Sequence, residues 1–206
     1  MKFISVRFTK IQNLNCIIHF KKPRADAIFA KNLRMLSEKL ASALNNQIQV
    51  EAISSQVYLA MASWAEVQGL EGVASFMYEQ SDEERLHMLK LVKFVNERGG
   101  HAIVSELKAP KSDFGTFKDM FQELFEHELK VSASINELVH TALEEKDYAT
   151  HNFLQWYVAE QIEEEAVART ILDKINLIGN DKGGLYLFDR DIKQLTVETA
   201  ANDNPK

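Results

Sequence analysis

The sequence predicts an all-α protein: a four-helix up-down bundle with one long crossover, followed by a short fifth helix. The chain has only 3 prolines and 8 glycines among its 206 residues, which favours long uninterrupted helices. Four long segments each carry one apolar stripe at helical spacing. The apolar content of 46% is ample for one domain with a proper core.

The first helix is expected from Ser37 to Gln68, with Ser37 as its N-cap. The segment Gly69–Gly72 then predicts a short turn, so the second helix should return antiparallel to the first. This second helix is expected from Gly72 to Gly99, where two consecutive glycines give a strong stop signal.

Residues 101–115 lack any helical period and are long enough to cross from one end of a bundle to the other. A short extended piece is expected within them, at 102–107. Two further long helices are expected at Thr116–Lys146 and Tyr148–Ile178, and Gly179 with the pair Gly183-Gly184 should end the second of these. The short fifth helix is expected at Tyr186–Leu195.

Polar residues interrupt each of the four apolar stripes near its middle. The interruptions are Glu51, then Glu84 with His87, then Glu128, then Gln161 with Glu164. Such mid-helix positions fall at about one level in a crossover bundle, and four unrelated buried charges in register would be very rare. Facing carboxylates cannot all be ionised without a cation, and oxygen ligands with one nitrogen suit divalent iron, manganese or zinc.

The pattern matches the carboxylate bundles that bind two irons, with one departure. Those bundles carry single glutamates on two helices and Glu-x-x-His on the other two. Glu51 and Glu128 are the single glutamates here, and Glu84-x-x-His87 is one motif, but the fourth helix has Gln161-x-x-Glu164 instead. One metal site should therefore be weaker and more exchangeable.

A second group of acids adjoins the first: Glu83, Glu160 and Glu163 precede the interrupting residues by one position. Each is rotated by about 100° around its helix, at the edge of the apolar stripe. These acids are interpreted either as solvated surface charge or as part of a third, looser cation site.

The charge of the chain is uneven. Residues 1–34 hold eight Lys and Arg against one acid, while the whole chain has a net charge of −6, so the remainder is strongly acidic. An acidic body favours cations as partners and argues against nucleic acid. No apolar run is long enough for a membrane span, and a single cysteine fits a reducing cytoplasm.

Three domains are delimited: a basic extension at 1–34, a di-iron domain at 35–196, and a disordered tail at 197–206. The extension has no helical period and is expected to be disordered or the product of a start codon assigned too early, with Met35 as the true start. A real basic tail and an organelle transit peptide are the alternatives.

From Met35 to about Leu195 the chain resembles the bacterial non-haem ferritins, members of the ferritin-like di-iron family. Glu51 with Tyr58, the run Glu83-Glu84-x-x-His87, and Glu128 carry this resemblance, together with FLQWYVAEQIEEE at 153–165 and GLYLFD at 184–189. A haem-containing relative would have a second Glu-x-x-His and a methionine where Arg85 and Leu86 stand, so no haem is expected.

The resemblance implies iron storage: Fe(II) is oxidised to Fe(III) by dioxygen or hydrogen peroxide at a di-iron ferroxidase centre, and ferric mineral is deposited inside a hollow homo-oligomer of 24 subunits. It implies a first iron on Glu51, Glu84 and His87, and a second on Glu84, Glu128, Gln161 and Glu164, with Glu84 bridging. It further implies a third iron on Glu83, Glu160, Glu163 and Glu164, and a redox-active Tyr58 beside the centre.

Two other functions are compatible with the same residues. One is a di-metal redox enzyme that detoxifies peroxide or oxidises a substrate without storing mineral, although bulky Phe121, Phe125 and Tyr157 along the stripes leave it little room. The other is a structural bundle with a polar network. His127, next to Glu128, is expected to support a ligand, and Trp156 and Tyr157 are expected in the core.

Overall fold

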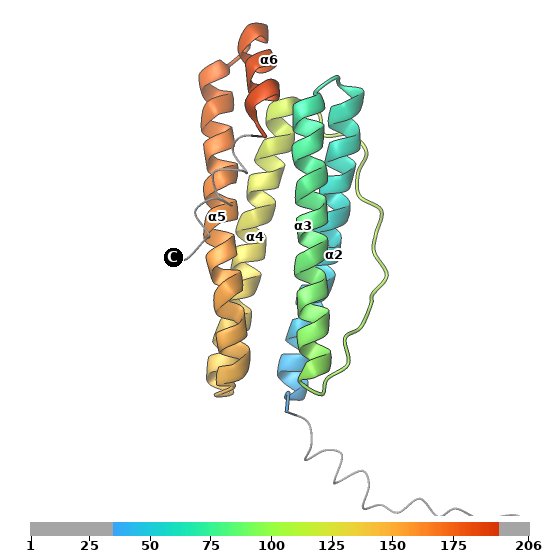
Figure 1. The fold of residues 1–206 in the computed structure, drawn as a ribbon, viewed down its shortest axis with the longest axis vertical. Coiled ribbons are helices and arrows are strands. Elements are labelled where there is room, and N and C mark those ends of the chain that lie inside the picture. The colour runs from blue at the N-terminus through green and yellow to red at the C-terminus, as the bar shows by residue number, and fades with distance from the viewer. Residues whose placement is uncertain (1–34, 194–206) are drawn as a thin grey trace, which may run out of the picture. The chain divides into compact units, whose positions relative to one another are not determined.

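The computed structural model describes residues 35–193, which form five α-helices and no strand (Figure 1). The helices are α2 (Glu38–Val67), α3 (Glu71–Glu97), α4 (Phe117–Glu144), α5 (Tyr148–Ile178) and α6 (Lys182–Asp191). The all-helical class predicted from the sequence is confirmed, and so is the bundle of four long helices. The predictions for 1–34 and 197–206 lie outside the described residues.

The long helices begin and end where local chemistry places them. Ser37 is the N-cap of α2 and accepts a hydrogen bond from the Leu40 amide at 3.0 Å. Thr116 forms a reciprocal capping box with Asp119 at the start of α4. Gly69 and Gly99 follow the ends of α2 and α3 with positive φ, a conformation in which a side chain would be strained.

The last helix differs from the sequence prediction. It begins at Lys182 rather than Tyr186, so Gly183 and Gly184 lie in its first turn and do not end α5, which stops at Ile178 before Gly179. The cause is Asp181, whose carboxylate accepts a hydrogen bond from the Gly184 amide at 2.6 Å and satisfies an N–H that the helix leaves free.

The helices are arranged as a crossover bundle. α2 and α3 form one antiparallel pair and α4 and α5 the other, with α2 also packing on α4. The connection from α3 to α4 returns along the full length of the first pair (Figure 1). It contains no regular secondary structure, so the piece expected at 102–107 is not a strand.

Two apolar clusters occupy opposite ends of the bundle. On α2, Leu40, Leu44 and Ile48 belong to one cluster, whereas Tyr58 and the residues after it belong to the other, which also includes Phe188 of α6. Between them α2 buries Glu51, Ser54 and Ser55. The core is therefore divided by a polar layer. None of the helices within 35–193 has the length and apolar character needed to cross a membrane.

Candidate metal centre

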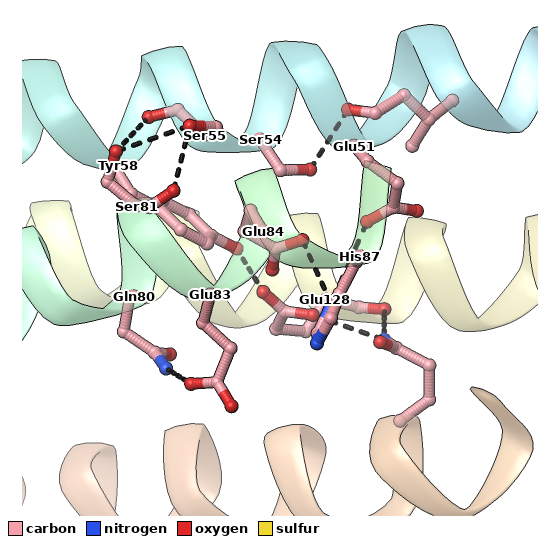
Figure 2. Close-up of polar contacts among 12 residues, drawn as sticks. Glu51, Ser54, Ser55, Tyr58, Gln80, Ser81, Glu83, Glu84, His87 and Glu128 are labelled. Atoms are coloured by element: carbon pink, nitrogen blue, oxygen red, sulfur yellow. Dashed lines mark hydrogen bonds and ion pairs between the residues drawn. The ribbon is translucent and has the colours of Figure 1, made fainter. Parts of the chain in front are cut away.

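The polar layer receives side chains from all four long helices, and Figure 2 shows it at close range. Its buried polar members are Gln47, Glu51, Ser54 and Ser55 of α2, Gln80, Ser81, Glu84 and His87 of α3, Glu128 of α4 and Gln161 of α5. Each interruption of a stripe singled out in the sequence lies in this layer, with Glu164 partly buried beside it. The helical period therefore predicted their common level correctly.

Three potential metal ligands meet between α2 and α3. Ligand atoms of Glu51, Glu84 and His87 lie within 4.8 Å of one another, and all three residues are buried. His87 Nδ1 is 3.5 Å from Glu84 Oε2 and 4.0 Å from Glu51 Oε2. Within 35–193 these same three atoms are buried without a hydrogen-bond partner. Buried polar atoms are normally paired, so their convergence indicates a site for a cation.

The electrostatics of this trio disfavour the charged form of Glu84 when no cation is bound. Burial and the neighbouring charge of Glu51 raise the pKa of Glu84 well above its usual value. Burial lowers the pKa of His87, which keeps the imidazole neutral with one nitrogen lone pair free to bind a metal. A divalent cation would relieve the repulsion between the two carboxylates and use that lone pair.

Glu128 faces the trio from α4, and both of its carboxylate oxygens are hydrogen-bonded. The Tyr58 hydroxyl donates to Oε1 (Figure 2). Gln161 Nε2 donates to Oε2 at 3.1 Å. Burial raises the pKa of Glu128, and these two hydrogen bonds partly oppose the rise. Both oxygens of Glu128 are thus held in fixed positions, and Tyr58, which is fully buried, contacts one of them directly.

Glu164 connects the centre with the second group of acids. Its pKa is raised well above the usual value, first by burial and then by the charges of Glu128, Glu83, Glu160 and Glu163. A cation nearby would favour the ionised form of this carboxylate, because it would offset the charges of the surrounding acids.

Two members of the second group of acids approach His87. Glu83 and Glu160, both partly buried, place ligand atoms within 4.8 Å of His87. Glu163 and Glu164 are not members of this trio, and their place in a third iron site stays a prediction. His87 therefore lies between the two groups of carboxylates.

Aromatic rings surround the imidazole of His87. Trp156 and Tyr157 stack on each other at 4.9 Å, and each meets the His87 ring edge-on, at 5.3 and 5.5 Å between centroids. Tyr157 is fully buried and Trp156 partly so, as expected for core residues. These rings fix the plane of the imidazole and exclude water from one side of the centre.

His127 lies where the sequence suggested, beside the ligands and away from the three converging atoms. Its Nε2 is 2.7 Å from Ser54 Oγ, and its ring meets the Tyr58 ring edge-on at 5.6 Å. Ser54 in turn donates to the Val50 carbonyl at 3.1 Å. The imidazole thereby packs the phenol ring that contacts Glu128.

Sequence reasoning missed Gln47 and Ser134, which contact the centre from α2 and α4. Gln47 donates to Glu51 at 2.5 Å and accepts from Ser134 at 2.6 Å. A signal was present, because Gln47 stands four positions before Glu51 on the buried side of the same helix.

Comparisons with known proteins agree with this geometry. Residues 41–178 match the family model of the ferritin-like domain. A probable bacterial non-heme ferritin-like protein of Haemophilus influenzae is 44% identical over 164 residues, covering 80% of this chain and 99% of that protein. A bacterial non-heme ferritin of Campylobacter jejuni is 44% identical over 163 residues, covering 79% and 98%.

A solved structure shows the same fold. The open pore ferritin of the archaeon Archaeoglobus fulgidus superposes with a TM-score of 0.76 at 45% sequence identity, over 77% of this chain and 97% of that one.

Proposed function

This chain belongs to the ferritin family, and from that premise we propose that it stores iron and oxidises it at the centre described above. Its relatives from Campylobacter jejuni and other bacteria are bacterial non-heme ferritins. The observation that carries the oxidation step is the convergence of three unpartnered ligand atoms from Glu51, Glu84 and His87. In this proposal iron is the substrate and the stored product.

The residues divide into two iron sites. Glu51, Glu84 and His87 would hold the first ion, and Glu84, Glu128, Gln161 and Glu164 the second, with Glu84 shared. Support for the second set comes from the hydrogen bond between Gln161 and Glu128 and from the raised pKa of Glu164, which a cation would lower. An amide in place of a histidine makes the second ion more weakly held, which suits an ion that must leave as product.

The chemistry requires two ions close together. Carboxylates stabilise Fe(III) more than Fe(II), so they lower the reduction potential and favour oxidation. Each of two Fe(II) ions gives up one electron, and dioxygen takes both electrons with two protons to leave as hydrogen peroxide. With hydrogen peroxide as oxidant, the same electrons and protons break the O–O bond and yield two waters. Tyr58, hydrogen-bonded to Glu128, is placed to donate an electron or a proton.

The solved archaeal ferritin structure supports a proposal for the assembly. We propose a hollow homo-oligomer of 24 subunits whose interior receives the ferric product as mineral. A cytoplasmic location stays a prediction from the sequence.

Aerobic addition of Fe(II) to the metal-free protein tests the proposal. We expect ferric absorbance to rise much faster than in buffer, and iron to co-elute with the assembled protein on gel filtration in large excess over its ligand sites. Oxidation without retained iron would instead indicate a di-metal oxidase that does not store mineral. Absence of both would leave only a structural bundle with a polar network.

The outer acids Glu83 and Glu160 are proposed to bind a third iron, with Glu163 and Glu164 adjoining it. Replacing Glu160 with Ala should leave the fast oxidation of the first irons intact and slow later cycles severalfold, since product would leave the centre less readily. Repeated additions of Fe(II), followed by stopped-flow absorbance, measure this. Asp173, an exposed acid of the same helix, provides the control variant Asp173→Ala. Equal later cycles in both variants would contradict a third site.

A further inference from the structure

Gln47 is a fully enclosed polar residue whose role is not explained by packing. It lies on α2, one turn before Glu51, and its side chain is 1% exposed. Its Nε2 donates to Glu51 Oε1 at 2.5 Å, and its Oε1 accepts from the Ser134 hydroxyl at 2.6 Å. A carboxylate can only accept, so the amide must direct its nitrogen towards Glu51 and its oxygen towards Ser134.

This contact makes the two oxygens of Glu51 inequivalent. Oε1 is occupied by Gln47, whereas Oε2 is buried with no hydrogen-bond partner and lies 4.0 Å from His87 Nδ1. Glu128 on the opposite helix differs, because both of its oxygens accept hydrogen bonds. Of the two single carboxylates, only Glu51 therefore presents one engaged oxygen and one free oxygen to the centre.

The hydrogen bond from Gln47 to Glu51 is held in place from outside α2. A glutamate side chain has three rotatable bonds, and an unrestrained carboxylate can offer a metal one oxygen or two. Ser134 belongs to α4, so the chain of contacts from Ser134 through Gln47 to Glu51 fixes the carboxylate relative to two helices at once. Partners that orient a ligand in this way set how strongly and in what geometry it binds.

We propose that Gln47 is a positioning residue that confines Glu51 to one-oxygen binding of the first metal ion, with Ser134 as its anchor. The first site then has three protein donors, one each from Glu51, Glu84 and His87, and keeps positions open for the oxidant and water. This inference rests on the proposed function, since it takes the trio to be a metal site.

Binding of Co(II) by the metal-free assembled protein tests the inference without any turnover. Gln47→Met keeps the length of the side chain and removes both hydrogen-bonding groups. We expect the Co(II) affinity of the first site to fall about tenfold, the lower end of the effect of losing a partner that orients a ligand. We also expect the visible spectrum of bound Co(II) to change, because Glu51 can then turn its second oxygen to the metal.

Three further variants separate positioning from general damage. Thr150→Val removes another buried hydroxyl, which lies near the start of α5 and has no hydrogen-bond partner. This variant should leave the affinity for Co(II) and the spectrum of bound Co(II) unchanged. Ser134→Ala should shift both in the direction of Gln47→Met, and Ser134→Thr, which keeps a hydroxyl, should restore them. If Gln47→Met does not fold, Ser134→Ala and Ser134→Thr together test whether Gln47 positions Glu51.

A folded Gln47→Met protein with wild-type Co(II) affinity and spectrum would overturn the inference and leave the proposed function intact. Wild-type behaviour of Ser134→Ala would equally remove Ser134 as the anchor and overturn the inference. A wild-type protein that binds no Co(II) at all would overturn the metal site itself, and the inference with it.

Discussion

Replacing Glu84 with Gln is expected to abolish rapid Fe(II) oxidation. Glu84 is the carboxylate that both proposed iron sites share, and its Oε2 is one of the three converging unpartnered atoms. The amide keeps the shape of the side chain but loses the negative charge, so neither ion is held at the distance that joint electron transfer needs. We expect the initial rate to fall by about 100-fold or more, equivalent to about 2.7 kcal/mol in the activation barrier.

The measurement is the stopped-flow ferric absorbance at two Fe(II) per subunit. Asp82→Asn is the matched control, because Asp82 is an exposed acid of the same helix, two positions away. Both proteins should assemble alike on gel filtration. A Glu84→Gln protein that oxidises its first irons at the wild-type rate would show that Glu84 is not a shared ligand.

The same substitution should stabilise the metal-free protein. The pKa of Glu84 is raised in the folded state, mainly by burial and then by the charge of Glu51. Protonated Glu84 therefore contributes its full stability at pH values below the pKa of the unfolded chain, near 4.5. This contribution is lost as the pH rises through the higher pKa of the folded protein. A glutamine has no such loss. The variant should therefore exceed the wild type in unfolding free energy at pH 7.5.

Thermal unfolding of both metal-free proteins between pH 5 and pH 8 measures this difference. The advantage of Glu84→Gln should be small at pH 5 and grow with pH, reaching several degrees in Tm. Excess Zn(II) should reverse the order, since cation binding stabilises only a protein that retains its ligands. A difference that does not change with pH would mean that Glu84 is not a buried, repelled carboxylate.

Much of the fold could be predicted because burial imposes a period on the sequence. Stripes at helical spacing located the four long helices, and Ser37 was recognised as the N-cap of the first. The same period placed Glu51, Glu84 and Glu128 at one level, because a residue on a core-facing stripe must point into the core. The position of α6 was not predictable in this way, because a pair of glycines usually signals the end of a helix. Here the N-cap Asp181 places both glycines in the first turn of α6.

Side-chain contacts between different helices could not be predicted from the sequence. Glu83 and Glu160 were expected in one site, but their closeness to His87 was not. It depends on how far α3 and α5 are rotated about their axes, which no stripe specifies to within one residue. The chain of contacts from Ser134 through Gln47 to Glu51 also crosses between helices that are distant in sequence. Such contacts decide which oxygen of a carboxylate is free, and so they determine the chemistry of the centre.

In the proposed function, bound cations balance the negative charge that is buried between α2, α3, α4 and α5. Anomalous diffraction from crystals soaked in Fe(II) under anaerobic conditions tests this most directly. We expect a pair of iron peaks in the polar layer, one beside Glu51, Glu84 and His87 and the other beside Glu84 and Glu128. Crystals without paired peaks there, or with these acids directed into bulk water, would contradict it.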